Sequence, residues 1–238
     1  MSTRVLAIGH RGAAGHLPEN TMPSFEKALE LGADALEFDV ALTLDGVPVV
    51  IHDDTLDRTT NGRGAIEQTL HKDLQSLDAG SWKGAPTHLP TLDEVLAEYA
   101  PRTLLNLEIK TSPRRGVLVE ACLEAVLQHK AADAVVFSSF DHDALRVLRT
   151  LMPKARIGVL CGLGSLEEGL ACALELGAEN LHPPVFLVTE ALVQRAHAAN
   201  LQVWTWTANA TEHISWLVAA GVDGIFSDWP ERVVLLRN

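Results

Sequence analysis

Histidine and arginine follow the first apolar, β-rich run of the chain, residues 5–9, as His10 and Arg11. A second histidine, His52, ends an extended run over residues 47–51. Cleavage of an alkyl phosphodiester requires one group to deprotonate the attacking oxygen and another to protonate a poor leaving group, and imidazole can do either near neutral pH. His10 and His52 are therefore candidates for a catalytic acid/base pair.

Acidic residues stand inside apolar strands at a spacing of two. Glu37 and Asp39 share one face of their run, as do Glu108 and Lys110, because residues two apart in a strand point the same way. Three converging carboxylates repel one another unless a cation or protons intervene, and hard oxygen ligands suit Mg²⁺ or Ca²⁺, with Mn²⁺ also compatible. We therefore predict one divalent metal ion at these carboxylates. Glu108 and Lys110 could instead form an ordinary ion pair.

The charges of this group suit a phosphodiester. The three carboxylates are offset by one divalent metal, Arg11 and Lys110, which leaves a single positive charge for a phosphodiester monoanion to neutralise. Arg11 offers a bidentate fork for phosphate oxygens, and Lys110 offers a point charge.

A repeating strand–helix pattern positions these residues. Segments of helical period alternate with eight short β-rich runs: 5–9, 35–42, 103–109, 134–138, 156–160, 179–182, 202–206 and 222–226. Glycine follows several helical segments, as in Gly177 and Gly221, which is the left-handed cap expected before a strand. Eight such units predict an α/β fold, a (β/α)8 TIM barrel, with an open doubly wound sheet as the alternative.

One segment departs from this pattern. Residues 53–90 are rich in Thr, Gly, Asp and Pro and show no strong period until a capping box, Thr91 with Glu94, opens the next helix. A stretch this long exceeds what a strand–helix loop needs, so we predict an inserted subdomain after the second strand. The whole chain, residues 1–238, is expected to form one barrel domain with this insertion.

Composition excludes several classes of protein. With 19 Lys and Arg against 31 Asp and Glu, the formal charge of −12 argues against nucleic-acid binding. No apolar run approaches the ~18 residues of a membrane span, so no membrane insertion is expected. The N-terminal residues lack a signal-peptide pattern, which predicts a cytoplasmic protein. Three cysteines without metal-binding spacing predict buried apolar side chains. The sequence leaves homo-oligomerisation open.

An ordered set of short motifs resembles the glycerophosphodiester phosphodiesterase family. The matching segments run from residue 10 to residue 230: His10-Arg11-Gly12, Pro18-Glu19-Asn20-Thr21, Glu37-Phe38-Asp39-Val40, His52-Asp53, Leu77-Asp78-Ala79-Gly80-Ser81-Trp82, Pro90-Thr91-Leu92, Glu108-Ile109-Lys110, Ser139-Phe140, Trp206-Thr207-Ala208-Asn209 and Ser227-Asp228 with Pro230. Each motif is short, but their order along nearly the whole chain is specific.

The resemblance implies a TIM barrel that hydrolyses glycerophosphodiesters, such as glycerophosphocholine, to sn-glycerol 3-phosphate and an alcohol. Applied to this chain, it implies that the three carboxylates bind the metal and that the two histidines are the acid/base pair. It assigns Arg11 and Lys110 to phosphate contacts, and Phe140 and Trp206 to the walls of a glycerol pocket. The substrate is thus a small-molecule phosphodiester.

Other interpretations remain beside this one. The chain could be a catalytically silent barrel that binds phosphodiesters, or a phospholipase D-like enzyme acting on lipids. Trp206 and Phe140 could simply fill the barrel. Asp53 is expected to cap a loop or support a neighbour, and Asp228 to cap the last helix. His182, which ends a predicted strand, is a candidate substrate contact.

Overall fold

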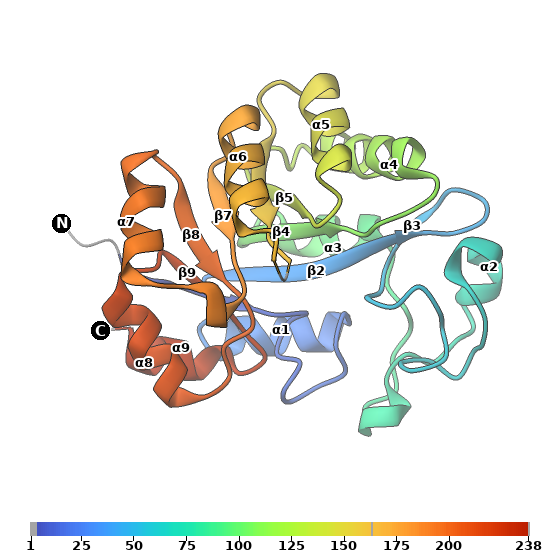
Figure 1. Cartoon of the computed structure of the whole chain (residues 1–238). Coiled ribbons are helices and arrows are strands. Elements are labelled where there is room, and N and C mark those ends of the chain that lie inside the picture. Colours follow the sequence, from blue (N-terminus) through green and yellow to red (C-terminus); the bar gives the residue numbers. More distant parts are fainter. Residues whose placement is uncertain (1–3, 163, 238) are drawn as a thin grey trace.

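A closed barrel of parallel strands forms the centre of the computed structural model, which describes residues 4–162 and 164–237 (Figure 1). The described residues contain eight strands in this parallel barrel: β1 (Leu6–Gly9), β2 (Ala35–Leu42), β4 (Leu104–Ile109), β5 (Val135–Ser139), β6 (Arg156–Leu160), β7 (Asn180–His182), β8 (Gln202–Thr205) and β9 (Gly224–Ser227). All eight predicted strands are confirmed, with ends that differ by at most two residues.

The barrel closes because β1 pairs with a strand on each side. Leu6 of β1 lies opposite Gly224 of β9, and Ile8 lies opposite Ala35 of β2, both in parallel pairing. An open doubly wound sheet has no such closing pair. The fold is therefore the predicted (β/α)8 TIM barrel.

Helices surround the barrel and connect successive strands. Their bounds are α1 (Met22–Glu30), α3 (Leu92–Tyr99), α4 (Arg115–Gln128), α5 (His142–Leu151), α6 (Leu166–Leu176), α7 (Glu190–Ala198), α8 (Thr211–Ala220) and α9 (Pro230–Leu236). The predicted capping box opens α3, since Thr91 and Glu94 each hydrogen-bond to the other's backbone N–H. Gly177 and Gly221 end α6 and α8 in the left-handed conformation, as predicted.

Apolar side chains pack on both sides of the barrel wall. Inside the barrel, Ile8, Trp204 and Phe226 belong to one buried cluster. Outside, a larger cluster joins the strands to the helices, where Phe38 of β2 meets Phe25 of α1 with ring centroids 5.8 Å apart. The two layers fix the strands, and with them the side chains at the strand ends.

The chain between β2 and α3 leaves the barrel repeat. β3 (Pro48–Val50) pairs antiparallel with β2, and short helical turns follow at η1 (Ile66–Gln68), α2 (His71–Leu74) and η2 (Ser81–Lys83). In Figure 1 this part lies to the right, beyond the ends of β2 and β3. It packs with β2 and β3 in a second apolar cluster: Ala41, Val49, Ile51, Leu56, Ile66, Leu74, Ala79 and Leu89. We refer to residues 53–90 as the insertion.

Two further expectations meet the structure in part. Cys122, Cys161 and Cys172 are buried free thiols, as predicted. In residues 4–162 and 164–237, no helix combines the length and apolarity that a membrane crossing requires. The expected lack of a signal peptide rests partly on residues 1–3, which lie outside the described residues. The predicted cytoplasmic location stays a prediction.

The close packing inside the barrel predicts a stability difference between two glycine variants. A Cβ at Gly158 of β6 would lie 2.3 Å from Cε1 of the buried His182, whereas a Cβ at Gly116 of α4 would meet no atom within 4 Å. We expect Gly158→Ala to lower the free energy of unfolding by about 1–3 kcal/mol. Gly116→Ala should leave it unchanged or raise it, since alanine favours a helix. Urea denaturation measures both, and equal stabilities would contradict the packing argument.

Candidate active site

Three carboxylates converge at the C-terminal ends of two neighbouring strands. Glu37 and Asp39 come from β2 and Glu108 from β4, and each offers an oxygen within 4.8 Å of the others. The parallel register puts Asp39 beside Glu108, and strand alternation turns Glu37 to the same side. Glu37 and Asp39 are almost fully buried. The cluster could hold a metal ion, as the sequence predicts.

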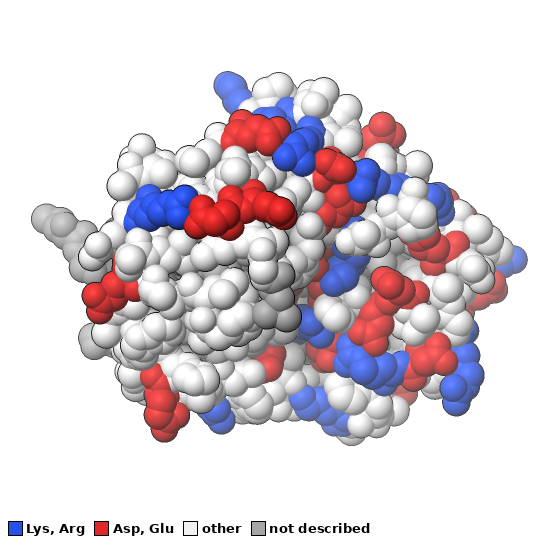
Figure 2. Space-filling model, viewed as in Figure 1, with Lys and Arg blue, Asp and Glu red and all other residues white. Residues whose placement is uncertain are grey.

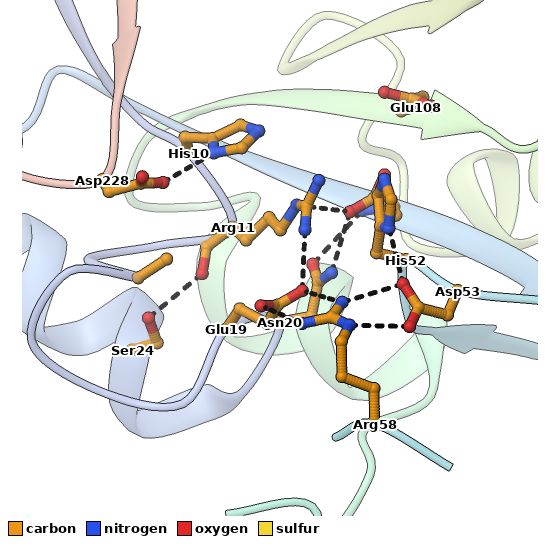
Figure 3. A network of polar contacts seen from close by, with 12 residues as sticks. His10, Arg11, Glu19, Asn20, Ser24, His52, Asp53, Arg58, Glu108 and Asp228 are labelled. Carbon is orange, nitrogen blue, oxygen red and sulfur yellow. Dashed lines mark hydrogen bonds and ion pairs between the residues drawn. The ribbon is translucent and has the colours of Figure 1, made fainter. Parts of the chain in front are cut away.

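Two cations contact this cluster, and Figure 3 shows the surrounding polar contacts. Lys110 Nζ lies 2.9 Å from Glu108 Oε1 and 3.3 Å from Asp39 Oδ1. Arg11 Nε lies 3.2 Å from Asp39 Oδ2, and the Arg11 backbone N–H donates to Glu37 Oε2 at 2.8 Å. Asp39 therefore lies between the two predicted phosphate-binding side chains.

The three carboxyl groups differ sharply in their affinity for protons. Burial, followed by the charge of Asp39, raises the pKa of Glu37 to about 8. The same two causes raise the pKa of Glu108. Burial alone would also raise the pKa of Asp39, but Lys110 and Arg11 outweigh it and lower that pKa to about 2. Lys110 and Arg11 thus leave part of the negative charge without compensation, and a hard divalent cation fits this oxygen donor set.

A carboxylate contacts the Nδ1 atom of each predicted catalytic histidine. His10 Nδ1 lies 2.7 Å from Asp228 Oδ1, and His52 Nδ1 lies 2.8 Å from Asp53 Oδ1. This leaves Nε2 of each ring for substrate chemistry, the arrangement in which a carboxylate orients a catalytic imidazole.

The surroundings shift the two histidine pKa values in opposite directions. Burial alone would lower the pKa of His10, but its hydrogen bond to Asp228 and the charge of Glu37 outweigh burial and raise that pKa. Burial lowers the pKa of His52, with the charges of Arg11 and Lys110 acting in the same direction. Two imidazoles of unequal proton affinity are suited to opposite roles in proton transfer.

The loop after β1 adopts a backbone that few residue types allow. Arg11 and Gly12 have φ values of 52° and 83°, and a Cβ at Gly12 would lie 2.5 Å from Ser24 Oγ. This turn aims the Arg11 N–H at Glu37. Asn20, from the same connection, donates from Nδ2 to Asp39 Oδ2 at 2.8 Å. The loop thus holds two of the three carboxylates in place.

The predicted aromatic walls line a narrow cavity beside the carboxylates. Phe140 and Trp206 meet edge to face with centroids 5.4 Å apart. They line a cavity of about 80 Å³ together with Leu160, Phe226, both histidines, Arg11, Asn106 and two of the carboxylates. Trp206 Nε1 donates to the His182 carbonyl at 2.9 Å, so its ring is held at the wall.

Outside this cavity the site opens into wider hollows. One, of about 420 Å³, runs past His52, Asp54 and Thr111. Another, of about 290 Å³, lies between the β1 loop and Trp82 of the insertion. In Figure 2, blue and red side chains crowd the right half of this face, whereas larger white areas lie on the left half.

The structure brings all nine predicted site residues to one end of the barrel. It corrects two secondary expectations. Asp228 caps no helix, because α9 has Trp229 at its N-cap position and no side-chain cap, and Asp228 instead contacts His10. His182 is fully buried and stacks on Trp204 inside the barrel, so its side chain is not at the cavity wall. Asp53 supports a neighbour, as predicted, by contacting His52.

Three further residues of the site were not singled out from the sequence. Glu19 accepts from Arg11 Nη1 at 2.7 Å, and Arg58 of the insertion bonds to both Glu19 and Asp53. Asn20 supports Asp39. Glu19 and Asn20 belong to a matching motif that carried no assigned role, whereas the spacing of Arg58 gives no signal at all.

The raised pKa of Glu37 predicts how stability depends on pH without metal. Its folded pKa of about 8 exceeds the ordinary 4.5, so its contribution to stability is complete below about pH 4.5 and is lost as the pH rises towards 8. In chelator, we expect the wild-type free energy of unfolding to fall relative to that of Glu37→Gln over this range. Added Mg²⁺ should reverse the difference.

Glu30→Gln is the matched control, because Glu30 lies on the surface of α1 with 58% of its side chain exposed. Its pH profile should follow the wild type. Urea denaturation across the pH range tests the prediction, and parallel profiles for the wild type and Glu37→Gln would contradict it.

Comparison with known proteins extends the resemblance across the chain. The model of the glycerophosphoryl diester phosphodiesterase family matches residues 10–232. A glycerophosphodiester phosphodiesterase of Caldanaerobacter subterraneus is 38% identical over 242 residues, covering 98% of each protein. One from Bacillus altitudinis is 36% identical, covering 99% of this chain and 98% of the relative.

Solved structures agree with this comparison. A phosphodiesterase of Oleispira antarctica, solved in complex with the product sn-glycerol-3-phosphate, has a TM-score of 0.89 at 34% identity and covers 98% of this chain and 96% of its own. A putative glycerophosphoryl diester phosphodiesterase of Silicibacter pomeroyi has a TM-score of 0.91 at 30% identity and covers 99% and 94%. The chain belongs to the glycerophosphoryl diester phosphodiesterase family.

Proposed function

We propose that this protein is a metal-dependent glycerophosphodiester phosphodiesterase that forms sn-glycerol 3-phosphate and an alcohol from substrates such as glycerophosphocholine. The observation that carries the proposal is a pair of histidines, each with a carboxylate at Nδ1, at a cluster of three carboxylates and two cations. Family membership and the product complex of the Oleispira antarctica relative support it.

Glu37, Asp39 and Glu108 are the proposed ligands of one divalent ion, with Mg²⁺, Ca²⁺ and Mn²⁺ all compatible with carboxylate oxygens. When bound, such an ion supplies positive charge that stabilises the phosphoryl oxygens. Arg11 and Lys110 border the same cluster, and their proposed role is to bind the non-bridging oxygens. Negative charge that develops on these oxygens in the transition state would then meet donors already in place.

His10 and His52 are the proposed groups that move protons. One Nε2 takes the proton from the attacking oxygen as its bond to phosphorus forms, and the other Nε2 gives a proton to the alcohol oxygen as its bond to phosphorus breaks. Attack by water gives glycerol 3-phosphate directly. Attack by the glycerol 2-hydroxyl gives a cyclic phosphate, and water must then open the ring in a second step in which the two histidines exchange their acid and base roles. Asp228 and Asp53 keep the rings oriented for this exchange.

The shape of the site suggests where each half of the substrate binds. The cavity walled by Phe140 and Trp206 is small and partly apolar, which suits glycerol. The wider hollows beside it leave room for the alcohol. We therefore propose broad tolerance for the alcohol group. Strict selectivity among choline, ethanolamine and glycerol diesters would contradict this part of the proposal.

The first test is release of glycerol 3-phosphate from glycerophosphocholine by the purified protein. We expect turnover to disappear after EDTA treatment and to return when Mg²⁺, Ca²⁺ or Mn²⁺ is restored. Stabilisation against heat by the substrate without turnover would instead support a silent binding barrel. Turnover of lysophospholipids alone would favour the phospholipase D-like alternative.

A second test addresses the histidines. With metal present, His10→Ala and His52→Ala should each lower kcat by at least ~10²-fold, because each removes one proton transfer. His213→Ala, an exposed position on α8, serves as the control and should retain wild-type kcat. Near-wild-type kcat in either active-site variant would exclude the acid/base assignment.

A further inference from the structure

The insertion contributes an arginine that bridges two supporting carboxylates of the site. The Arg58 guanidinium donates from Nε and Nη2 to both oxygens of Asp53, at 2.7 and 2.8 Å. It also donates from Nη1 and Nη2 to both oxygens of Glu19, at 2.8 Å each. Figure 3 shows Arg58 between the two acids.

Each of these acids also holds a group that faces the substrate. Asp53 Oδ1 lies 2.8 Å from His52 Nδ1, and Glu19 Oε1 accepts from Arg11 Nη1 at 2.7 Å. Arg58 therefore lies at the centre of a chain of contacts that runs from His52 to Arg11. Arg58 is absent from the residues that line the cavity holding Glu37, Glu108 and Phe140, and lies at the edge of the site, where it lines the wider hollow beside the β1 loop.

A role in stability alone does not account for this geometry. The Arg58 side chain is 45% exposed, so solvent screens its ion pairs and reduces what each contributes to folding. Two bidentate contacts instead fix the planes of two carboxylates, which a planar guanidinium can do and a lysine ammonium cannot. Asp53 and Arg58 lie before the first helical turn of the insertion, η1, and without Arg58 the contact with His52 Nδ1 is what remains to orient the Asp53 carboxylate.

We propose that Arg58 is a positioning residue, through which the insertion sets the orientation of His52 and the charge around Arg11. The proposal rests on the function proposed above. Without Arg58, Asp53 can rotate away from Nδ1, and His52 loses the contact that keeps its Nε2 directed at the substrate. Glu19 would then share its charge with Arg11 alone, which weakens the attraction of Arg11 for phosphate.

Two substitutions separate these effects. Arg58→Lys keeps the charge but loses the fork, so kcat should fall at least about 5-fold while KM stays near the wild-type value. Arg58→Met loses both the charge and the two bidentate contacts, so kcat should fall about 10-fold or more and KM should rise. The matched control is Arg63→Met, because Arg63 belongs to the same insertion, is 87% exposed and pairs only with Asp57 at 3.4 Å. Its kinetics should equal the wild type.

A double-mutant cycle asks whether Arg58 acts through Asp53. If it does, adding Arg58→Met to Asp53→Asn should lower kcat little further than Asp53→Asn alone. Full multiplication of the two kcat effects would overturn the proposal, as would kcat within 2-fold of the wild type in both Arg58 variants. Thermal unfolding of each variant identifies any loss of folded protein, and Arg58→Lys keeps the test decisive if Arg58→Met does not fold.

The orientation of His52 can also be read without turnover. Long-range ¹H–¹⁵N spectra with Mg²⁺ present should show the His52 ring of the wild type protonated at Nδ1, and a mixture of tautomers in Arg58→Met. His10 is the internal reference, because its partner Asp228 is bonded to Asn209 and not to Arg58. An unchanged His52 ring would overturn the proposal. If the wild type hydrolyses no diester, the proposed function fails, and these spectra still decide the role of Arg58.

Discussion

The convergence of three carboxylates in a buried position is the constraint that organises this protein. Their oxygens lie within 4.8 Å of one another, and burial penalises each charge. Lys110, Arg11 and Asn20 surround Asp39 and keep its pKa low. Burial and the charge of Asp39 instead raise the pKa of Glu37 to about 8. The negative charges are thus compensated unevenly. Asp39 is stabilised by the two cations, whereas Glu37 and Glu108 need further positive charge to become ionised. A divalent ion and an anionic substrate together suit such a site better than either would alone.

The register of the barrel strands brings the three carboxylates together. Parallel pairing puts Asp39 of β2 beside Glu108 of β4, and the closing pair of β1 with β2 delivers the loop whose backbone contacts Glu37. Inside the barrel, Trp204 and Phe226 pack tightly, so the polar end rests on a rigid apolar layer. Strand pairing fixes the position of each carboxylate. The loops after the strands position only the groups that contact these carboxylates.

Periodicity explains which features the sequence could predict. The eight strands appear as short apolar runs between helical segments, the carboxylates and Lys110 within them are spaced by two, and the histidines follow strand ends, all of which are local properties of the sequence. The interpretation of Asp228 failed because the residues beside it suggest a helix cap, whereas its real partner, His10, lies 218 positions away. Arg58 went unnoticed because the insertion has no period from which a direction could be derived. His182 ends a strand as predicted, but β7 turns its ring into the barrel.

The two histidines depend on different parts of the fold. Asp228, which holds His10, follows β9 and is itself fixed by Asn209, so this support belongs to the barrel. Asp53, which holds His52, is fixed by Arg58 and so depends on the insertion. The insertion packs in an apolar cluster around Leu56 and Ile66 that also includes Ala41 of β2 and Val49 of β3. Loosening that cluster would therefore disturb the support of His52 more directly than the support of His10. In the proposed mechanism the insertion thus supports His52, whereas the barrel supports His10.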